Sequence, residues 1–234
     1  MVPALEEILA ATKSMVFFGG AGVSTESGIP DFRSVDGLYH QKFKYPPETM
    51  LSHTFYETHT AEFFDFYRQK LIVHGAKPNA AHLRLAALER EGKCRAVVTQ
   101  NIDGLHQAAG SKTVYELHGS TLRNYCTRCG KFFPVQFIED AAGVGDGVPR
   151  CNECGGIVKP DVVLYEEGLD EETMENAVHA IRGADTLIVG GTSLAVYPAA
   201  GLLRYFRGEN LVVINKQPTP ADAMANLLIH ATIG

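Results

Sequence analysis

The sequence predicts an α/β fold in which a parallel sheet carries helices on both faces. Short apolar segments alternate along the chain with longer segments of helical pattern, the order typical of parallel strands joined by right-handed crossovers. Most of the apolar segments lack polar alternation, as strands covered on both faces do. A chain of 234 residues, 45% hydrophobic and 21% charged, is long enough to bury such a core without crosslinks.

Five segments are expected to form the buried strands of this sheet. Each runs for five or six residues and is rich in Val, Ile, Leu or Phe. Residues 161–165 are expected to add a sixth strand. The five segments are Met15–Gly19, Cys94–Thr99, Thr113–Leu117, Thr186–Gly190 and Leu211–Asn215.

Helical patterns fill intervals between these strands. Residues 1–14 predict an amphipathic helix and not a signal peptide, because they carry two Glu and no basic region. Residues 79–91, 171–183 and 197–207 predict further helices. Pro198 suits the first turn of the last one, where a missing N–H is tolerated.

Two segments interrupt the alternation of strands and helices. Residues 34–78 show no buried-strand pattern and are rich in aromatic residues within helical text. Residues 122–157 hold four of the five Cys and few large aliphatic residues. We therefore expect a discontinuous main domain (1–33, 79–121 and 158–234), a helical module (34–78) and a metal-binding module (122–157).

The composition excludes several function classes. With 21 basic and 27 acidic residues the net charge is −6, and no run of Lys and Arg stands out, so we expect no direct nucleic-acid binding. No apolar stretch reaches the length of about 18 residues that spans a membrane, so we expect no membrane partner. We expect a cytoplasmic chain, whose thiols stay reduced. The five Cys then favour a metal or a reactive thiol over disulfides.

The most specific local pattern is a pair of Cys-x-x-Cys turns, Cys126 with Cys129 and Cys151 with Cys154. Glycine follows each second Cys, which lets the backbone fold back so that amides face the sulfurs. Four thiolates suit one structural, tetrahedral zinc ion and leave no open position for catalysis. Two disulfides or an iron–sulfur centre are alternatives that a reducing compartment and this spacing disfavour. Cys94 stands alone and is expected in the core.

A glycine-rich loop after the first strand predicts a dinucleotide site of an unusual kind. Gly20 and Gly22 fit a strand-to-helix turn whose amides approach a pyrophosphate, and Ser24 and Thr25 add hydroxyl donors. However, Thr25 replaces the third glycine of the dinucleotide fingerprint, and the acidic residue expected about 20 positions later is missing. The pattern is therefore not that of an ordinary dehydrogenase, and a plain tight turn explains the glycines about equally well.

Polar residues also follow other predicted strands, at the edge where ligands bind in open α/β sheets. His118 is the best candidate for a general base, because no other of the nine His both ends a strand and precedes a Gly. Asn215 could bond a ribose in place of the missing acid. Each residue alone has an ordinary explanation as a helix cap or a core side chain. The residues expected to converge are Asp31, Arg33, Asn101, Asp103, His118, Ser193 and the second glycine loop at 190–194.

A set of motifs covers nearly the whole chain. It comprises Gly20-Ala-Gly, Gly28-Ile-Pro-Asp-Phe-Arg33, Thr99-Gln-Asn-Ile-Asp103, Leu105-His106, Glu116-Leu-His-Gly119, both Cys turns, Lys159-Pro-Asp-Val-Val163, Gly191-Thr-Ser-Leu194 and Val213-Ile-Asn215. In these motifs and their order the chain resembles the sirtuins, which are NAD-dependent protein-lysine deacylases. It is most similar to the small bacterial and archaeal members.

The resemblance implies a Rossmann-like domain that carries a small zinc-ribbon module and a helical module, with NAD between them. It implies that Phe32 covers the nicotinamide end of NAD and that Asp103 bonds the carboxamide. Asn101, Asp103 and His118 would be catalytic. The implied NAD contacts are Gly20, Ala21, Gly22, Thr25, Asp31, Phe32, Arg33, Gln100, Asn101, Ile102, Asp103, His118, Gly191, Thr192, Ser193, Asn215 and Ala231.

The resemblance also implies a reaction that consumes NAD and moves no hydride, which agrees with the missing dehydrogenase pattern. The acyl-lysine oxygen attacks the nicotinamide ribose, nicotinamide leaves, and His118 acts as general base on the ribose hydroxyls. The products are nicotinamide, free lysine and 2′-O-acetyl-ADP-ribose. An acetylated lysine in an extended segment would contact Val162, Val163, Leu164, Tyr165, Leu194 and Val196.

The expected acyl group is acetyl. Sirtuins that prefer succinyl or malonyl groups resemble each other in a Tyr-x-x-Arg pair that meets the carboxylate. Here Tyr67 and Arg68 are adjacent, and neighbours on a helix point about 100° apart. Other acyl groups, ADP-ribosyl transfer and NAD hydrolysis stay open on the same scaffold. A non-catalytic module built on the zinc ribbon is a further alternative, against which His118 and Asp103 weigh. We expect a monomer.

Overall fold

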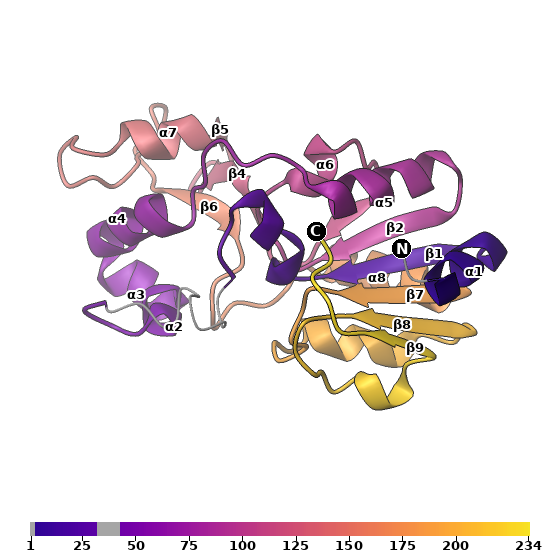
Figure 1. Cartoon of the computed structure of the whole chain (residues 1–234). Helices are drawn as coiled ribbons and strands as arrows, with labels where there is room; N and C mark the ends of the chain where they lie inside the picture. Colours follow the sequence, from indigo (N-terminus) through magenta and orange to yellow (C-terminus); the bar gives the residue numbers. More distant parts are fainter. Residues whose placement is uncertain (1–2, 32–42) are drawn as a thin grey trace.

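The computed structural model describes residues 3–31 and 43–234 of the chain. Its largest element is a six-stranded parallel sheet of order β3-β2-β1-β7-β8-β9 (Figure 1). Helices cover both faces, so the fold class predicted from the sequence is confirmed. The strands are β1 (Met15–Gly19), β2 (Cys94–Thr99), β3 (Val114–Glu116), β7 (Thr186–Gly190), β8 (Asn210–Ile214) and β9 (Leu227–Ile229).

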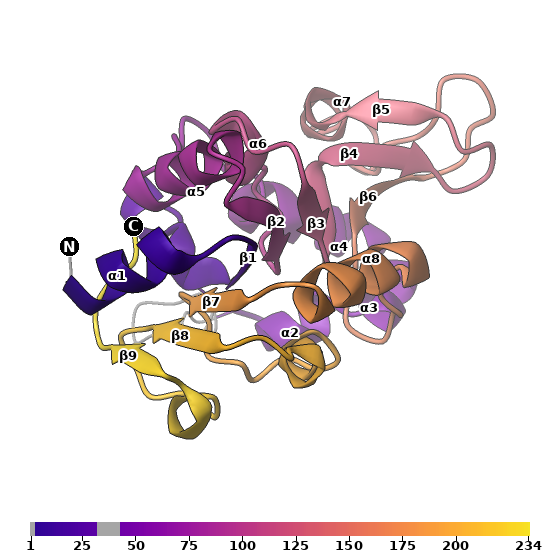
Figure 2. The same cartoon turned by 90° about the vertical axis from the view of Figure 1, so that its right-hand side faces the viewer.

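Alternate side chains of the strands enter two separate cores. Phe17 and Ile188 pack with α1 and α5 on one face, while Phe18 and Val189 pack with α8 and η4 on the other. Figure 2 shows α1 and α5 on one side of the strands and α8 on the other. Burial on both faces explains why these strands lack polar alternation. The helices are α1 (Pro3–Ala11), α5 (Ala80–Arg90), α6 (Leu105–Ala108), α8 (Glu171–Arg182) and the 3₁₀ helix η4 (Ala199–Tyr205).

A three-stranded antiparallel sheet of order β5-β4-β6 lies beside the large sheet, together with four short helices (Figure 1). Phe63 and Tyr67 of α4 share one hydrophobic cluster with Phe133, Ile138 and Val158. The aromatic-rich segment and the cysteine segment are therefore packed on a common core. The elements are β4 (Gly119–Cys126), β5 (Phe132–Pro134), β6 (Val158–Val162), α2 (Pro47–Met50), α3 (His53–Thr58), α4 (Thr60–Lys70) and α7 (Val135–Asp140).

Two predicted elements were wrong. Residues 161–165 do not add a strand to the parallel sheet, because β6 ends at Val162 and pairs antiparallel with β4. The sixth parallel strand is β9, whose three half-buried or exposed residues form too short a pattern to stand out in sequence. Within residues 197–207 only Ala199–Tyr205 are helical, and they form the 3₁₀ helix η4 and not an α-helix. Gly201 lies inside this segment, and glycine disfavours an α-helix interior.

Candidate functional site

The loops after β1 and β7 lie against each other at the carboxyl ends of the strands. The Gly20 N–H donates to the Gly190 carbonyl at 3.3 Å, and the Gly22 N–H donates to the Gly191 carbonyl at 2.8 Å. A Cβ on Gly22 would lie 2.8 Å from the Gly191 Cα, and Gly191 itself has a φ of +58°. Both glycines are thus required by the close approach of two backbones.

Residues 20–28, called the cofactor loop below, do not begin an α-helix as predicted. They form two 3₁₀ turns, η1 (Ala21–Val23) and η2 (Thr25–Ser27), and Gly28 ends the second in the left-handed region. The Thr25 hydroxyl donates to the Gly22 carbonyl at 3.0 Å, which holds the first turn closed. The loop expected to bind the pyrophosphate therefore consists of two compact 3₁₀ turns. No α-helix begins within these residues whose dipole could face the phosphates.

Ser24 ties the cofactor loop to the loop after β2. Its hydroxyl donates to Asp103 Oδ2 at 2.6 Å and accepts from Asn101 Nδ2 at 3.0 Å. The other Asp103 oxygen accepts from the Leu105 N–H at 2.9 Å and so caps α6. The structure brings Asn101 and Asp103 together as predicted. Asp103 both caps a helix and belongs to the cluster of polar side chains at this edge.

His118 lies between β3 and β4, at the carboxyl end of the large sheet. Its Nδ1 is 3.0 Å from the Gln100 carbonyl oxygen. Since a carbonyl only accepts, Nδ1 carries the hydrogen and Nε2 is the nitrogen free to take a proton. Burial lowers the pKa of His118 below its usual 6.5, although the bond to Gln100 opposes the shift. The Gln100 side chain donates to Thr192 Oγ1 at 3.0 Å, which joins the loops after β2 and β7.

The remaining residues predicted to contact the cofactor differ in how far they are exposed. Ser193 and Ala231 are exposed, while Ala21, Asp31 and Ile102 are half-buried. The Asn215 amide nitrogen donates to the Gln217 carbonyl at 2.8 Å, so its carboxamide oxygen is the group available to a ligand. Phe32 and Arg33 lie outside the described residues. Hydroxyl, carboxamide and imidazole groups around tight glycine turns fit the phosphates and ribose of a dinucleotide.

The predicted peptide-contact residues follow β6. The N–H groups of Val163, Leu164 and Tyr165 donate to the His118 carbonyl, to Glu167 Oε2 and to the Leu51 carbonyl. Leu194 is only 5% exposed and its side chain packs in the core with α8 and η4. In this loop a peptide could therefore contact only the backbone of Leu194, which has a φ of +54°, and the half-buried side chain of Val196.

The four cysteines gather in the small module as predicted. All four sulfurs lie within 4.8 Å of one another, with Cys126–Cys154 at 3.3 Å and Cys129–Cys151 at 3.7 Å. Zinc–sulfur bonds of about 2.3 Å in a tetrahedron place sulfurs about 3.8 Å apart, whereas a disulfide needs about 2 Å. The arrangement therefore suits one structural metal ion, and zinc fits its donor set.

The backbone supports a thiolate at two of the four cysteines. At Cys129 the Lys131 N–H favours ionisation, but the sulfurs of Cys126 and Cys154 outweigh it and raise the pKa to about 12, and the pKa of Cys154 is raised as well. Burial opposes ionisation of Cys126, but N–H groups of Cys129 and Arg128 outweigh it and lower the pKa to about 6. Burial likewise opposes ionisation of Cys151, where N–H groups of Glu153 and Cys154 lower the pKa. Cys94 is different: it is 3% exposed, and burial raises its pKa to about 12, as expected of a core thiol.

Sequence reasoning missed one residue that holds the cofactor loop. Asn79 caps α5 by accepting from Ala81 N–H at 3.0 Å, and its Nδ2 donates to the Val23 carbonyl at 2.7 Å. The signal for the cap was present, since Pro78-Asn79 precedes a helical pattern. The bond to Val23 depends on tertiary placement, which the pattern does not contain.

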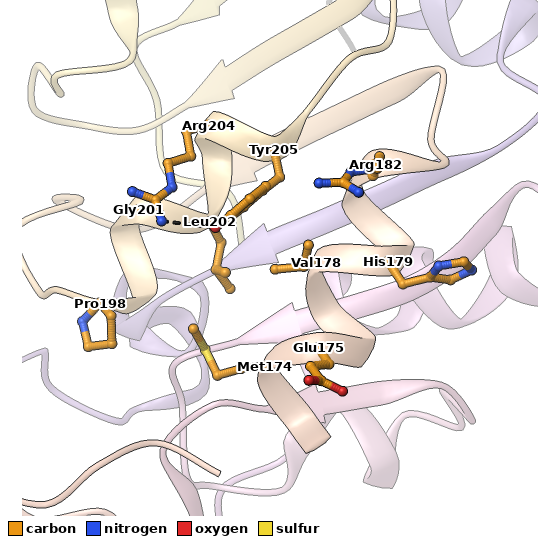
Figure 3. A pocket seen from close by; sticks show the side chains of 10 residues that line it. All are labelled: Met174, Glu175, Val178, His179, Arg182, Pro198, Gly201, Leu202, Arg204 and Tyr205. Atoms are coloured by element: carbon orange, nitrogen blue, oxygen red, sulfur yellow. Dashed lines mark hydrogen bonds between the residues drawn. The ribbon is translucent and has the colours of Figure 1, made fainter. Parts of the chain in front are cut away.

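Two features away from this edge bear on what the chain contacts. A surface pocket of about 450 Å³ lies between α8 and η4 and is lined by Val178, Arg182, Leu202 and Tyr205 among others (Figure 3). Arg182 lies over the Tyr205 ring at 5.7 Å, so a cation–π contact closes one side. In the described part of the chain, no helix has the length and apolarity to cross a bilayer.

Comparison with known proteins places this geometry in context. A family model described as "Sir2 family" matches residues 20–198. A protein named NAD-dependent protein deacetylase from Clostridium acetobutylicum is 62% identical over 98% of this chain and 94% of its own length. A solved structure of Sir2 with a p53 peptide and NAD+ is 38% identical, with a TM-score of 0.88, and covers 100% of this chain and 94% of that one. A Sir2 variant with a deacetylated p53 peptide and 3′-O-acetyl ADP ribose has a TM-score of 0.89 at 38% identity, over 98% of this chain and 93% of that one.

Proposed function

The chain belongs to the Sir2 family, and from this membership and the site geometry we propose that it removes acetyl groups from lysine side chains of proteins at the expense of NAD. The reaction releases nicotinamide and 2′-O-acetyl-ADP-ribose. NAD, when bound, supplies the electrophilic ribose carbon and the nicotinamide leaving group. The acetylated lysine is presented by an extended peptide segment.

The mechanism rests on the tautomer and the charge of His118. Its Nδ1–H is engaged with the Gln100 carbonyl, so Nε2 offers a lone pair to a ribose hydroxyl. Burial keeps its pKa below 6.5, so the ring is uncharged near pH 7. A general base placed in this way contributes on the order of 10²–10⁴ in rate.

The neighbouring residues are proposed to bind and orient. Ser24, Asn101 and Asp103 form one hydrogen-bonded unit, which we assign to the nicotinamide side together with Gln100 and Ile102. We assign the two glycine loops to the pyrophosphate side. Further assigned contacts on the cofactor are Thr25, Asp31, Phe32, Arg33, Thr192, Ser193, Asn215 and Ala231.

The peptide is proposed to pair with the backbone after β6. The N–H groups of Val163, Leu164 and Tyr165 are already engaged. The carbonyls of Leu164 and Tyr165 accept from Glu167 and His53, and that of Val162 accepts from Lys159 Nζ. We therefore assign the Val163 carbonyl, which has no donor among the described residues, as the acceptor for the peptide backbone. Acetyl is preferred over succinyl because Arg68 is committed elsewhere. Its guanidinium donates to the carbonyls of Ile138 and Gly147 at 3.3 and 2.9 Å. Tyr67 is fully buried.

We propose further how the chain is divided into modules, where it is located and in which oligomeric state it works. We assign residues 34–78 and 122–157 as modules carried by the NAD-binding domain. Four thiolates require reducing surroundings, which supports a cytoplasmic location. A net charge of −6 supports function without direct contact to nucleic acid, and we assign a monomer.

Product analysis tests the function. The protein is incubated with NAD and an acetyl-lysine peptide, and the products are identified by mass spectrometry. Deacetylated peptide, nicotinamide and acetyl-ADP-ribose in equal amounts are expected. In His118→Ala the deacetylated peptide and acetyl-ADP-ribose should disappear, because the proposed base acts after nicotinamide has left. ADP-ribosylated protein or free ADP-ribose as the main product would contradict the proposal.

A further inference from the structure

Two histidines outside the proposed machinery pack against each other behind the cofactor loop. The rings of His82 on α5 and His106 on α6 have centroids 4.7 Å apart, and the residues are 0% and 1% exposed. Three of their four ring nitrogens, His82 Nε2 and both of His106, have no hydrogen-bond partner among the described residues. Burying polar atoms in this way costs free energy, so packing alone does not account for imidazoles at both positions.

The first histidine reaches the cofactor loop through Asn79. His82 Nδ1 lies 2.9 Å from Asn79 Oδ1, and Asn79 Nδ2 donates to the Val23 carbonyl at 2.7 Å. Asn79 Oδ1 only accepts, and we assign the ring hydrogen to His82 Nδ1 because this contact is the shorter of the two that the nitrogen makes. The backbone N–H of Asn79, at 3.3 Å from the same nitrogen, is the longer contact and cannot be made at the same time.

The second histidine belongs to the element that holds the next loop residue. His106 lies in α6, whose first N–H, that of Leu105, is capped by Asp103. Asp103 in turn accepts from the Ser24 hydroxyl at 2.6 Å. Val23 and Ser24 are consecutive residues, so the contact between the two rings sets the spacing of two anchors on one turn of the cofactor loop.

We propose that His82 and His106 are positioning residues for NAD, holding α5 against α6 so that the backbone at Val23 and the hydroxyl at Ser24 keep the cofactor loop in its binding conformation. The inference rests on the proposed function. Neither side chain reaches the surface, so neither touches a ligand. Burial lowers the pKa of His106 to about 3, so the pair is uncharged at neutral pH.

Matched substitutions at position 82 separate positioning from packing. His82→Asn places an amide nitrogen near the position of Nδ1 and keeps a donor for Asn79, whereas His82→Leu retains bulk and loses the donor. Loss of this bond is expected to raise two constants about tenfold. These are the Kd for NAD, measured by titration calorimetry, and the KM for NAD. The kcat and the KM for acetyl-peptide should stay within about twofold, and His82→Asn should recover most of the affinity. His179→Leu, at an exposed site on α8, is the control and should bind as the parent does.

Asn79→Asp covers the case in which the histidine variants do not fold. Aspartate still caps α5 and accepts from His82, but it cannot donate to Val23. It should also weaken NAD binding about tenfold, while the helix content of the whole chain, measured by circular dichroism, stays that of the parent. NAD binding by His82→Leu or Asn79→Asp as tight as that of the parent would overturn the positioning role, as would a fall in kcat at unchanged Kd. Failure of the parent itself to bind NAD would instead refute the proposed function.

Discussion

His118 shows how one hydrogen bond prepares a side chain for its proposed role as a general base. The Gln100 carbonyl fixes the hydrogen on Nδ1, and burial disfavours the charged ring. A base whose pKa lies below 6.5 becomes protonated, and so inactive, only when the pH falls through that lowered value. We therefore expect kcat/KM to be flat near pH 7 and to decline on the acid side with a midpoint below 6.5, measured with saturating zinc. A midpoint at or above pH 7 would assign the limb to another group.

Asp103 offers a second test at the scale of single side chains. Asp103→Asn keeps the shape but presents an N–H where Oδ1 or Oδ2 now accepts. Either the Leu105 bond is lost, or the Ser24 bond reverses and the Ser24 hydroxyl loses its carboxylate acceptor. We expect exchange of labelled nicotinamide to slow at least about tenfold, while the Kd for ADP-ribose changes less than about threefold. Equal losses in both measurements would place Asp103 away from the nicotinamide pocket.

Single residues differ in how far sequence could identify them. His118 could be selected because it ends a strand and precedes glycine, but its tautomer depends on Gln100, which only the tertiary fold brings near. Leu194 was expected to contact peptide, yet its side chain is buried beside α8. A sequence motif gives the position of such a residue and not the direction of its side chain.

Among the elements, the two cysteine turns depend most on a bound ion. Cys151→Ser removes one of four ligands and leaves a buried module without its crosslink. We expect the metal content to fall from one zinc per chain to near zero and the melting temperature to drop by about 10 °C or more. Cys94→Ala is the control for metal content and should retain the zinc. A Cys151→Ser variant that melts with the parent would show that the module needs no metal.

Helix α4 supplies a test of acyl preference. Arg68 bonds the carbonyl of Ile138 in α7 and that of Gly147 after it, so its role is to join the helix to the cysteine module. Arg68→Met should lower the free energy of unfolding by about 1–3 kcal/mol, because two carbonyls lose their donor. The ratio of deacetylation to desuccinylation, measured with paired peptides, should stay within about twofold. A marked change in that ratio would show that Arg68 does face the acyl group.

Elements could be predicted from sequence where pattern and length agreed. The strands at Met15–Gly19 and Thr186–Gly190 have the expected bounds because both faces are apolar. The three residues of β9 give too little pattern, and β6 was assigned to the wrong sheet because a Val-rich run does not reveal its partner. Pairing is a long-range property, which local composition cannot fix.

For the whole molecule, buried imidazoles make stability depend on pH. The pKa values of His82, His106 and His118 are lowered by burial, to about 3 for His106, against about 6.5 in an unfolded chain. Acid therefore favours the unfolded state, so stability is complete above pH 6.5 and declines as the pH falls below it. His106→Phe should reduce the slope between pH 6 and 5 by about 1.4 kcal/mol per pH unit, measured by urea unfolding. Parallel curves for variant and parent would contradict this.

The sequence predicted the overall class and two departures from the main sheet, but not how these departures are joined. Phe63 and Tyr67 lie far along the chain from Phe133 and Val158, and their common core requires the β4–β6 sheet to fold back over α4. Apolar side chains in each segment indicated burial without identifying the partner. The large sheet was easier to infer because consecutive strand–helix units constrain their own neighbours.

The passage from β3 to β4 joins the two sheets at a junction that tolerates little change. Only Leu117 and His118 separate the two strands, and Gly119, with a φ of +74°, packs so closely on Asp161 that a side chain there would overlap its carbonyl oxygen. The His118 carbonyl accepts from the Val163 N–H, directly after β6. The imidazole therefore takes its position from both sheets at once, and any change in how the small sheet packs at Asp161 reaches His118 through the adjacent peptide bond.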